Sequence, residues 1–175
     1  MKRAVFLDRD GVINQAIVRN GVPYPPSKLG ELKILPGVSE ALKKLHASNY
    51  LLIVVTNQPD VARGTTKREE VERINAHLAS TLTIDAIKTC YHDNCDGCLC
   101  RKPLPGALIG AAEEYGIDLT KSFMVGDRWR DIEAGRLSGC KTFFVDYGYA
   151  EQQPEAPDFI VSSLLEVQKI ITGEF

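Results

Sequence analysis

The chain has 175 residues, of which 44% are hydrophobic and 25% charged, and this ordinary usage excludes a disordered tail or a fibre. Its 21 Lys and Arg residues against 23 Asp and Glu residues give a net charge of −2, so no general positive field attracts nucleic acid or anionic lipid. No apolar run approaches the roughly 18 residues of a membrane span, and the first run ends too early, at Asp8, for a signal peptide. We expect a cytoplasmic monomer, one domain over residues 1–175, with neither nucleic acid nor a membrane as partner.

The first half of the chain predicts two strands and two helices. Ala4–Leu7 and Leu51–Val55 are continuous apolar runs, typical of parallel strands that are buried on both faces. Between them, apolar residues recur at helical spacing from Val38 to Leu45. A second helix is predicted from about Thr66 to Thr81, with an apolar stripe and acidic residues in its early turns.

The second half continues the alternation of strands and helices. Strands are predicted over Ile84–Thr89, Phe123–Val125, Thr142–Val145 and Phe159–Val161, and helices over Ala107–Tyr115, Ile132–Leu137 and Leu164–Ile171. This alternation indicates a doubly wound α/β fold with a mainly parallel sheet. The chain length leaves no room for a large cap domain.

One long connection, from about Asn14 to Leu35, lacks a periodic pattern and contains Pro23-Tyr24-Pro25-Pro26. Irregular connections of roughly 20 residues are uncommon in compact domains and are usually functional. This one leaves the carboxyl end of the first strand, where open α/β sheets bind ligands. We therefore expect an irregular loop that shapes the substrate site.

Chemically active residues follow several of the predicted strands. Asp8 and Asp10 follow the first strand, two residues apart, so an extended backbone points both carboxylates the same way and Arg9 away. The later strand ends carry Thr56-Asn57-Gln58, Arg101-Lys102 and Asp127-Arg128, with Asp131 four residues beyond Asp127. Because the ends of parallel strands share one edge, these side chains are expected in one cleft. Clustered carboxylates would repel one another, and a divalent cation such as Mg²⁺ would relieve that repulsion.

Four segments carry a resemblance to a known superfamily: Phe6 to Asn14 (FLDRDGVIN), Val55 to Gln58 (VTNQ), Cys100 to Pro103 (CRKP) and Val125 to Arg128 (VGDR). They resemble, in order, the four motifs of haloacid dehalogenase-superfamily phosphatases. Within that superfamily they are most similar to the D-glycero-D-manno-heptose 1,7-bisphosphate phosphatases, and next to histidinol-phosphate phosphatases. The resemblance runs from about Lys2 to Tyr149, and it implies hydrolysis of a sugar phosphate, most specifically the 7-phosphate of the heptose bisphosphate used in surface-polysaccharide precursor synthesis.

The resemblance also implies a role for each matching residue. Asp8 would be the nucleophile that forms an aspartyl-phosphate, and Asp10 the acid and then the base. Thr56 and Lys102 would stabilise the transferring phosphoryl group. Mg²⁺ would be held by Asp8, Asp127 and the backbone carbonyl of Asp10, with Asp131 expected as a supporting partner. The expected substrate contacts are Asn57, Gln58, Arg101 and Arg128.

Four cysteines lie within eleven residues, and Cys90, His92, Cys98 and Cys100 form the pattern C-x-H-x₅-C-x-C. Three thiolates and an imidazole make a tetrahedral set that suits a structural zinc ion, and the heptose bisphosphate phosphatases share this spacing. A set that uses Cys95 instead of one of these ligands, and buried or redox-active cysteines, stay open as alternatives. Because Cys100 directly precedes Arg101 and Lys102, zinc in the loop 90–100 would fix the lysine that faces the phosphate.

The sequence departs from that family where Pro59-Asp60 follows Gln58. Pro59 removes a backbone donor, and Asp60 adds negative charge near a phosphate site. Two other functions are compatible with some of these motifs. A receiver domain also carries an aspartyl-phosphate but lacks the Asp-x-Asp pair, and a zinc-dependent nucleic-acid module would need more basic residues than the cysteine loop has. A P-loop kinase is excluded because the chain lacks the G-x-x-x-x-G-K-[ST] motif.

Overall fold

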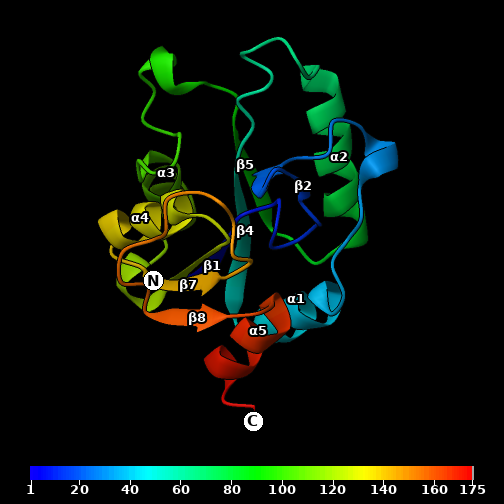
Figure 1. The fold of residues 1–175 in the computed structure, drawn as a ribbon. Coiled ribbons are helices and arrows are strands. Elements are labelled where there is room, and N and C mark those ends of the chain that lie inside the picture. The colour runs from blue at the N-terminus through cyan, green and yellow to red at the C-terminus, as the bar shows by residue number, and fades with distance from the viewer. Residues whose placement is uncertain (175) are drawn as a thin grey trace.

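A computed structural model describes residues 1–174, and within them a six-stranded sheet forms the centre of the molecule (Figure 1). Its order is β5-β4-β1-β6-β7-β8, and each neighbouring pair is parallel. The strands are β1 (Arg3–Leu7), β4 (Tyr50–Asn57), β5 (Ala86–Cys90), β6 (Phe123–Gly126), β7 (Lys141–Val145) and β8 (Phe159–Val161). The predicted doubly wound, mainly parallel α/β fold is confirmed.

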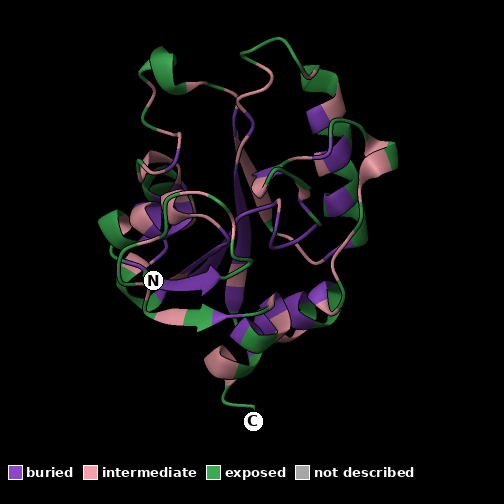
Figure 2. Ribbon diagram, in the orientation of Figure 1, coloured by how far each residue is buried: buried purple, intermediate pink, exposed green. Residues whose placement is uncertain are grey.

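Helices cover both faces of the sheet because the side chains of each strand alternate between two cores. In β1, Val5 and Leu7 pack with one apolar cluster and Ala4 and Phe6 with the other. The first cluster includes residues of α1 (Val38–Ala47), α2 (Arg68–Thr81) and α5 (Leu164–Thr172), and the second includes residues of α3 (Gly106–Tyr115) and α4 (Trp129–Ser138). Figure 2 shows the resulting buried layer along the sheet.

The ends of two helices differ from the prediction. Helix α4 begins at Trp129, three residues before the predicted start at Ile132. The carboxylate of Asp131 accepts the backbone N–H of Arg128 at 3.0 Å, which satisfies a donor that the helix itself leaves free. Helix α2 begins at Arg68 rather than Thr66. The early start of α4 brings Trp129 and Arg130 into its first turn, next to the cleft.

The prediction of an irregular loop over 14–35 was wrong in part. This segment contains an antiparallel hairpin of β2 (Ile17–Arg19) and β3 (Val22–Tyr24), followed by a 3₁₀ turn over Leu29–Glu31. Asn20 and Gly21 join the strands with φ values of 52° and 75°. Asn-Gly is the pair that a two-residue hairpin turn with positive φ favours, and this local signal was overlooked.

The topology fixes where a ligand can bind. The chain builds β4 and β5 on one side of β1 and then crosses to β6 on the other side. In open α/β sheets the crevice at such a reversal, beyond the carboxyl ends of the strands, is the usual ligand site. Asp8 and Asp127 directly follow the Leu7 and Gly126 ends of the two strands that meet there. Within residues 1–174, the helices are too short or too polar to cross a bilayer.

Candidate active site

A cavity of about 250 Å³ lies at this edge of the sheet. Its lining includes seven of the predicted site residues: Asp8, Asp10, Asn57, Arg101, Lys102, Asp127 and Arg128. The β2–β3 hairpin contributes Val22, Pro23, Tyr24 and Pro25, so the 14–35 segment does help to shape the cavity. Thr56 and Gln58 are buried beneath the lining rather than part of it.

Lys102 is the centre of the buried charge cluster. Its ammonium donates to Asp8 Oδ1 at 2.9 Å and to the Val55 carbonyl at 2.7 Å, and it lies 2.7 Å from Asp131 Oδ1. Burial alone would lower the pKa of Lys102, but the carboxylates of Asp131 and Asp8 outweigh it and raise that pKa. The lysine therefore stays charged although its side chain is almost fully buried.

Asp127 lies against the turn that follows Asp8. Tyr149 donates its hydroxyl hydrogen to Asp127 Oδ2 at 2.8 Å. Within the described chain, the buried Oδ1 atom of Asp127 lacks a hydrogen-bond partner. Gly11 has a φ of 89°, and a Cβ there would lie 2.0 Å from Asp127 Oδ2. The glycine therefore permits both the turn and the close approach of this carboxylate.

The chemistry of these carboxylates fits a bound divalent cation. Asp8, Asp127 and Asp131 place a carboxylate oxygen each within 4.8 Å of one another. Burial, followed by repulsion from Asp131, raises the pKa of Asp8 to about 6 even though Lys102 lowers it. Burial and the charge of Asp8 also raise the pKa of Asp127. A divalent cation that prefers oxygen ligands would relieve this repulsion. Asp127 Oδ1, which lacks a hydrogen-bond partner among the described residues, would coordinate that cation. Asp131 already receives Lys102 and the Arg128 amide on separate oxygens, which suits the predicted supporting role.

Asp10 is oriented by three side chains. Gln58 Nε2 donates to Asp10 Oδ2 at 2.9 Å, and Asn14 Nδ2 donates to Oδ1 at 3.0 Å. The expectation that Arg9 points away was wrong: the fully buried Arg9 guanidinium donates to Asp10 Oδ1 at 3.1 and 3.2 Å, and also to Asn75 of α2. The arginine side chain is long enough to bend back, so that its guanidinium pairs with the Asp10 carboxylate. A buried guanidinium without such a partner would cost several kcal/mol of stability.

The three polar residues at the end of β4 have separate contacts. Gln58 Nε2 also donates to Thr56 Oγ1 at 2.9 Å, which links Thr56 to Asp10. Asn57 brackets the Lys102 backbone, because Nδ2 donates to the Lys102 carbonyl at 3.0 Å and Oδ1 accepts the Lys102 N–H at 3.1 Å. The end of β4 thus positions both the lysine and Asp10.

The predicted arginines line the cavity but have protein partners. Arg128 forms a bidentate ion pair with Glu151, and Arg101 Nε donates to Asn94 Oδ1 at 2.8 Å. Arg63 and Arg130 also line the cavity and were missed by the sequence analysis. Asp60, the departure at the β4 end, lies 3.5 Å from Arg63, which offsets its negative charge. Tyr149 and Glu151, which follow β7, are two further site residues that the sequence did not predict.

The predicted zinc ligands come together in the loop that follows β5. Cys90 Sγ lies 3.7 Å from Cys98 Sγ and 3.1 Å from Cys100 Sγ, and His92 Nδ1 lies 3.6 and 3.4 Å from Cys90 and Cys100. In a tetrahedron with Zn–S bonds of about 2.3 Å, the sulfur–sulfur edge is about 3.8 Å. The four ligand atoms lie within 4.8 Å of one another, and exposed Cys95 is not a member of this group. The geometry therefore favours the set that excludes Cys95.

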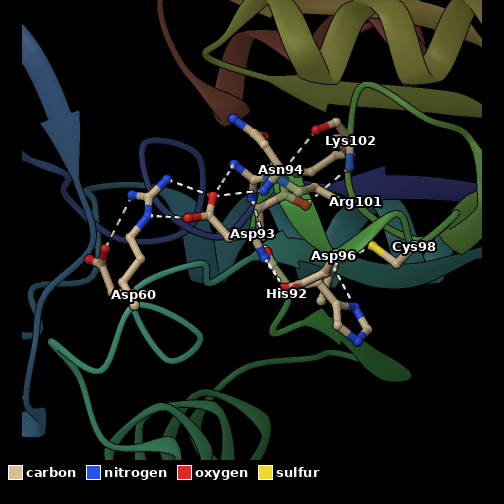
Figure 3. A network of polar contacts seen from close by, with 11 residues as sticks. Asp60, His92, Asp93, Asn94, Asp96, Cys98, Arg101 and Lys102 are labelled. Atoms are coloured by element: carbon tan, nitrogen blue, oxygen red, sulfur yellow. Dashed lines mark hydrogen bonds and ion pairs between the residues drawn. The ribbon is translucent and has the colours of Figure 1, made fainter.

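Polar contacts connect the predicted zinc loop, residues 90–100, to the cleft (Figure 3). Arg63 Nε donates to Asp93 Oδ2 at 2.7 Å, and its second nitrogen donates to Asp93 Oδ1 at 2.8 Å. These bonds and the Arg63 charge lower the pKa of Asp93 to about 2. Together with the Arg101–Asn94 bond, they connect the loop to two arginines that line the cavity. These contacts hold residues 93 and 94 of the loop against the cleft.

Comparisons with known proteins agree with this geometry. A family model described as HAD-hydrolase-like matches residues 99–167. The D-glycero-β-D-manno-heptose 1,7-bisphosphate 7-phosphatase of Pasteurella multocida is 34% identical over 99% of this chain and 98% of its own. The chain belongs to this family of haloacid dehalogenase-like phosphatases. The enzyme of the same name from Helicobacter pylori is 36% identical over 76% of each chain.

A solved structure of the family has the same fold. The D,D-heptose 1,7-bisphosphate phosphatase of Bordetella bronchiseptica, complexed with magnesium and phosphate, superposes with a TM-score of 0.79 at 28% identity and covers 99% of both chains. The resemblance seen in the four motifs is thereby confirmed at the level of family and fold.

Proposed function

We propose that this chain is a Mg²⁺-dependent phosphatase that removes the 7-phosphate from D-glycero-β-D-manno-heptose 1,7-bisphosphate through an aspartyl-phosphate. Membership of the family and the names of its relatives support the substrate. The main structural support for the proposed reaction is a buried cluster of charged residues. In it, Lys102 donates a hydrogen bond to Asp8, and carboxylate oxygens of Asp8 and Asp127 lie within 4.8 Å of each other. Such a cluster suits attack on a phosphate by a carboxylate whose charge is balanced.

Asp8 is the proposed nucleophile. One carboxylate oxygen forms a bond to phosphorus while the bond from phosphorus to the sugar oxygen breaks, which divides hydrolysis into two easier steps. Water then attacks phosphorus and releases inorganic phosphate, restoring the carboxylate. The bond from Lys102 to Asp8 Oδ1 fixes the side chain and leaves Oδ2 for the attack.

Asp10 is the proposed acid and base. It lines the cavity beside Asp8, and it would donate a proton to the departing sugar oxygen and then take a proton from the attacking water. Its contacts with Gln58, Asn14 and Arg9 hold the carboxyl group in a defined orientation. The same Gln58 holds Thr56, which with Lys102 would stabilise the charge on the transferring group.

Mg²⁺ would be held by Asp8, Asp127 and the backbone carbonyl of Asp10, with Asp131 as a supporting partner. When bound, the ion supplies positive charge that lets an anionic carboxylate approach an anionic phosphate. Asp127 Oδ1 is buried and has no hydrogen-bond partner within residues 1–174, so it is available as a ligand. Tyr149 on the other oxygen keeps that carboxylate from turning away.

A structural zinc ion in the loop 90–100 is the second proposed metal. Cys90, His92, Cys98 and Cys100 would supply four ligands, which leaves no open position for chemistry. Thiolates that bind zinc would suit our prediction of a cytoplasmic location, where stable disulfides are rare. The single domain, the monomeric state and the absence of a nucleic-acid or membrane partner also stay predictions.

The test is phosphate release by the purified full chain with Mg²⁺. The panel contains the α and β anomers of heptose 1,7-bisphosphate, a hexose bisphosphate and histidinol phosphate, the substrate of the second phosphatase that the motifs resemble. We expect the highest kcat/KM for the β-heptose. Equal or higher kcat/KM for histidinol phosphate would replace the substrate assignment, and a stable phosphoprotein without turnover would favour the receiver alternative.

A further inference from the structure

Five cationic side chains line the cavity, and four of them are engaged by protein groups. Lys102 binds Asp8 and Asp131, and Arg128 binds Glu151. The two others, Arg63 and Arg101, bind residues of the zinc loop: Arg63 donates to Asp93, and Arg101 donates to Asn94 and lies 4.0 Å from Asp93. Their charges are thus largely used to hold the site together.

Arg130 is the exception. It lines the cavity from the first turn of α4 and is half-buried. Its guanidinium carbon lies 4.7 Å from the centre of the Trp129 ring. Throughout residues 1–174, it has neither an ion-pair partner nor a hydrogen-bond acceptor within reach. Within the described residues, this charge therefore has no direct ion-pair partner, although the carboxylates of Glu151 and Asp131 act on it from a longer distance.

The surroundings of Arg130 make that charge unfavourable until an anion arrives. Burial, and after it the positive charges of Arg101 and Arg128, lower the pKa of Arg130. An anion bound there would satisfy the planar guanidinium with two hydrogen bonds and relieve the repulsion. The reacting phosphate is proposed to lie at Asp8 and Lys102, whose charges already balance each other. We therefore assign the anion at Arg130 to a second group of the substrate.

We propose that Arg130 binds the second, non-reacting phosphate of the substrate and thereby selects bisphosphates over monophosphates. The inference rests on the proposed function, since it assumes that the reacting phosphate is attacked by Asp8. It assigns selectivity to a residue outside the four motifs. Arg128, the motif arginine, is held by Glu151 and has less capacity for a further anion.

The experiment compares two substrates that release the same phosphate: heptose 1,7-bisphosphate and heptose 7-phosphate. In Arg130→Ala, the ratio of kcat/KM for the bisphosphate to kcat/KM for the monophosphate should fall about 10- to 100-fold, mainly through a higher KM for the bisphosphate. In Arg130→Lys, the ratio should fall less than in Arg130→Ala. Lysine retains the positive charge but lacks the planar guanidinium that donates two parallel hydrogen bonds to a phosphate. Arg136→Ala is the matched control, since Arg136 is exposed on the same helix and pairs with Glu133.

The outcomes separate this inference from the proposed function. If the wild-type chain does not hydrolyse the heptose bisphosphate, the proposed substrate is wrong, and the same ratio is then measured with a hexose 1,6-bisphosphate and a hexose 6-phosphate. A ratio in Arg130→Ala that stays within twofold of the wild-type ratio, whether or not the absolute rates fall, overturns the role of Arg130. Circular dichroism spectra that match the wild type establish that each variant is folded.

Discussion

The carboxylate cleft and the zinc loop are held in place in different ways. In the cleft, Asp8, Lys102, Asp127 and Asp131 are each less than 10% exposed. Asp8 and Asp127 directly follow β1 and β6, Asp131 lies in the first turn of α4, and the buried Lys102 ammonium pairs with Asp8 and Asp131. In the loop, Cys90 is buried at the end of β5, but Cys98 and Cys100 are only half-buried and Cys95 is exposed. The cleft is therefore part of the core of the fold, whereas the loop depends on its own ligand set and on a few ion pairs.

The two regions meet at Lys102. Its ammonium belongs to the cleft, and its backbone belongs to the chain that leaves the cysteine cluster. Asn57 brackets that backbone from β4, so the proposed zinc ion would not be the sole restraint on the lysine. This arrangement predicts that damage to the cleft abolishes activity, whereas damage to the loop reduces it.

The largest effect is expected from Asp8→Asn, which removes the nucleophile. Activity should fall at least about 10⁴-fold, as with other essential nucleophiles. The fold should persist because the amide is isosteric and Lys102 keeps Asp131 as a partner. Phosphate release and the thermal midpoint are the measurements, with Asp146→Asn, an exposed residue beyond β7, as the control. Substantial activity in Asp8→Asn would refute the proposed chemistry.

A smaller effect is expected from Cys98→Ser, which breaks the zinc set. Zinc content should fall from about one per chain, and activity should fall about 10- to 100-fold because Arg101 and Lys102 lose one of their restraints. Metal analysis, kcat and the thermal midpoint are measured together. Cys95→Ser is the matched control, since Cys95 lies outside the cluster, and it should retain zinc and activity. Zinc loss in Cys95→Ser would require a different ligand set.

Tyr149→Phe tests whether the contact between Tyr149 and Asp127 supports metal binding in the cleft. It removes the hydroxyl that holds Asp127 Oδ2 and should weaken Mg²⁺ binding about 10-fold, the usual cost of losing a group that orients a metal ligand. The dissociation constant is measured by calorimetry. The control is Tyr147→Phe: its ring stacks on Tyr149, but its hydroxyl donates to the Gly11 carbonyl. Equal losses in both variants would mean that the segment as a whole, rather than the Asp127 contact, supports the metal.

The pH dependence of Mg²⁺ affinity is the mildest test. The pKa of Asp8 in the metal-free protein is about 6, and the pKa of Asp127 is also raised. Below its pKa the Asp8 carboxyl group is protonated, and protons then compete with the ion. Affinity should therefore decrease as pH falls through 6, by about tenfold per pH unit once a single proton must be displaced. A constant affinity between pH 5 and 7.5 would show that the ion is held by other groups.

Some features of the site could be predicted from the sequence because their causes are local. Apolar runs such as Leu51–Val55 indicated buried parallel strands, and the alternation with helices indicated that their ends share one edge. This was enough to expect Asp8, Lys102 and Asp127 in one cleft. The spacing of Cys90, His92, Cys98 and Cys100 was likewise sufficient to group the proposed zinc ligands. The Asn20-Gly21 turn was also local, but it was overlooked.

Other features depend on residues that are far apart in the chain. The bonds from Tyr149 to Asp127 and from Glu151 to Arg128 span 22 and 23 residues, and Arg9 reaches Asn75 over 66 residues. Their formation depends on the twist of the sheet and on which side of the cleft each loop crosses, which no local pattern encodes. The sequence by itself determined the fold class and which residue types meet at the sheet edge. Only the tertiary structure decided which cations are already paired, and hence that Arg130 is the charge left for an anion, because pairing depends on distances of a few ångströms between separate loops.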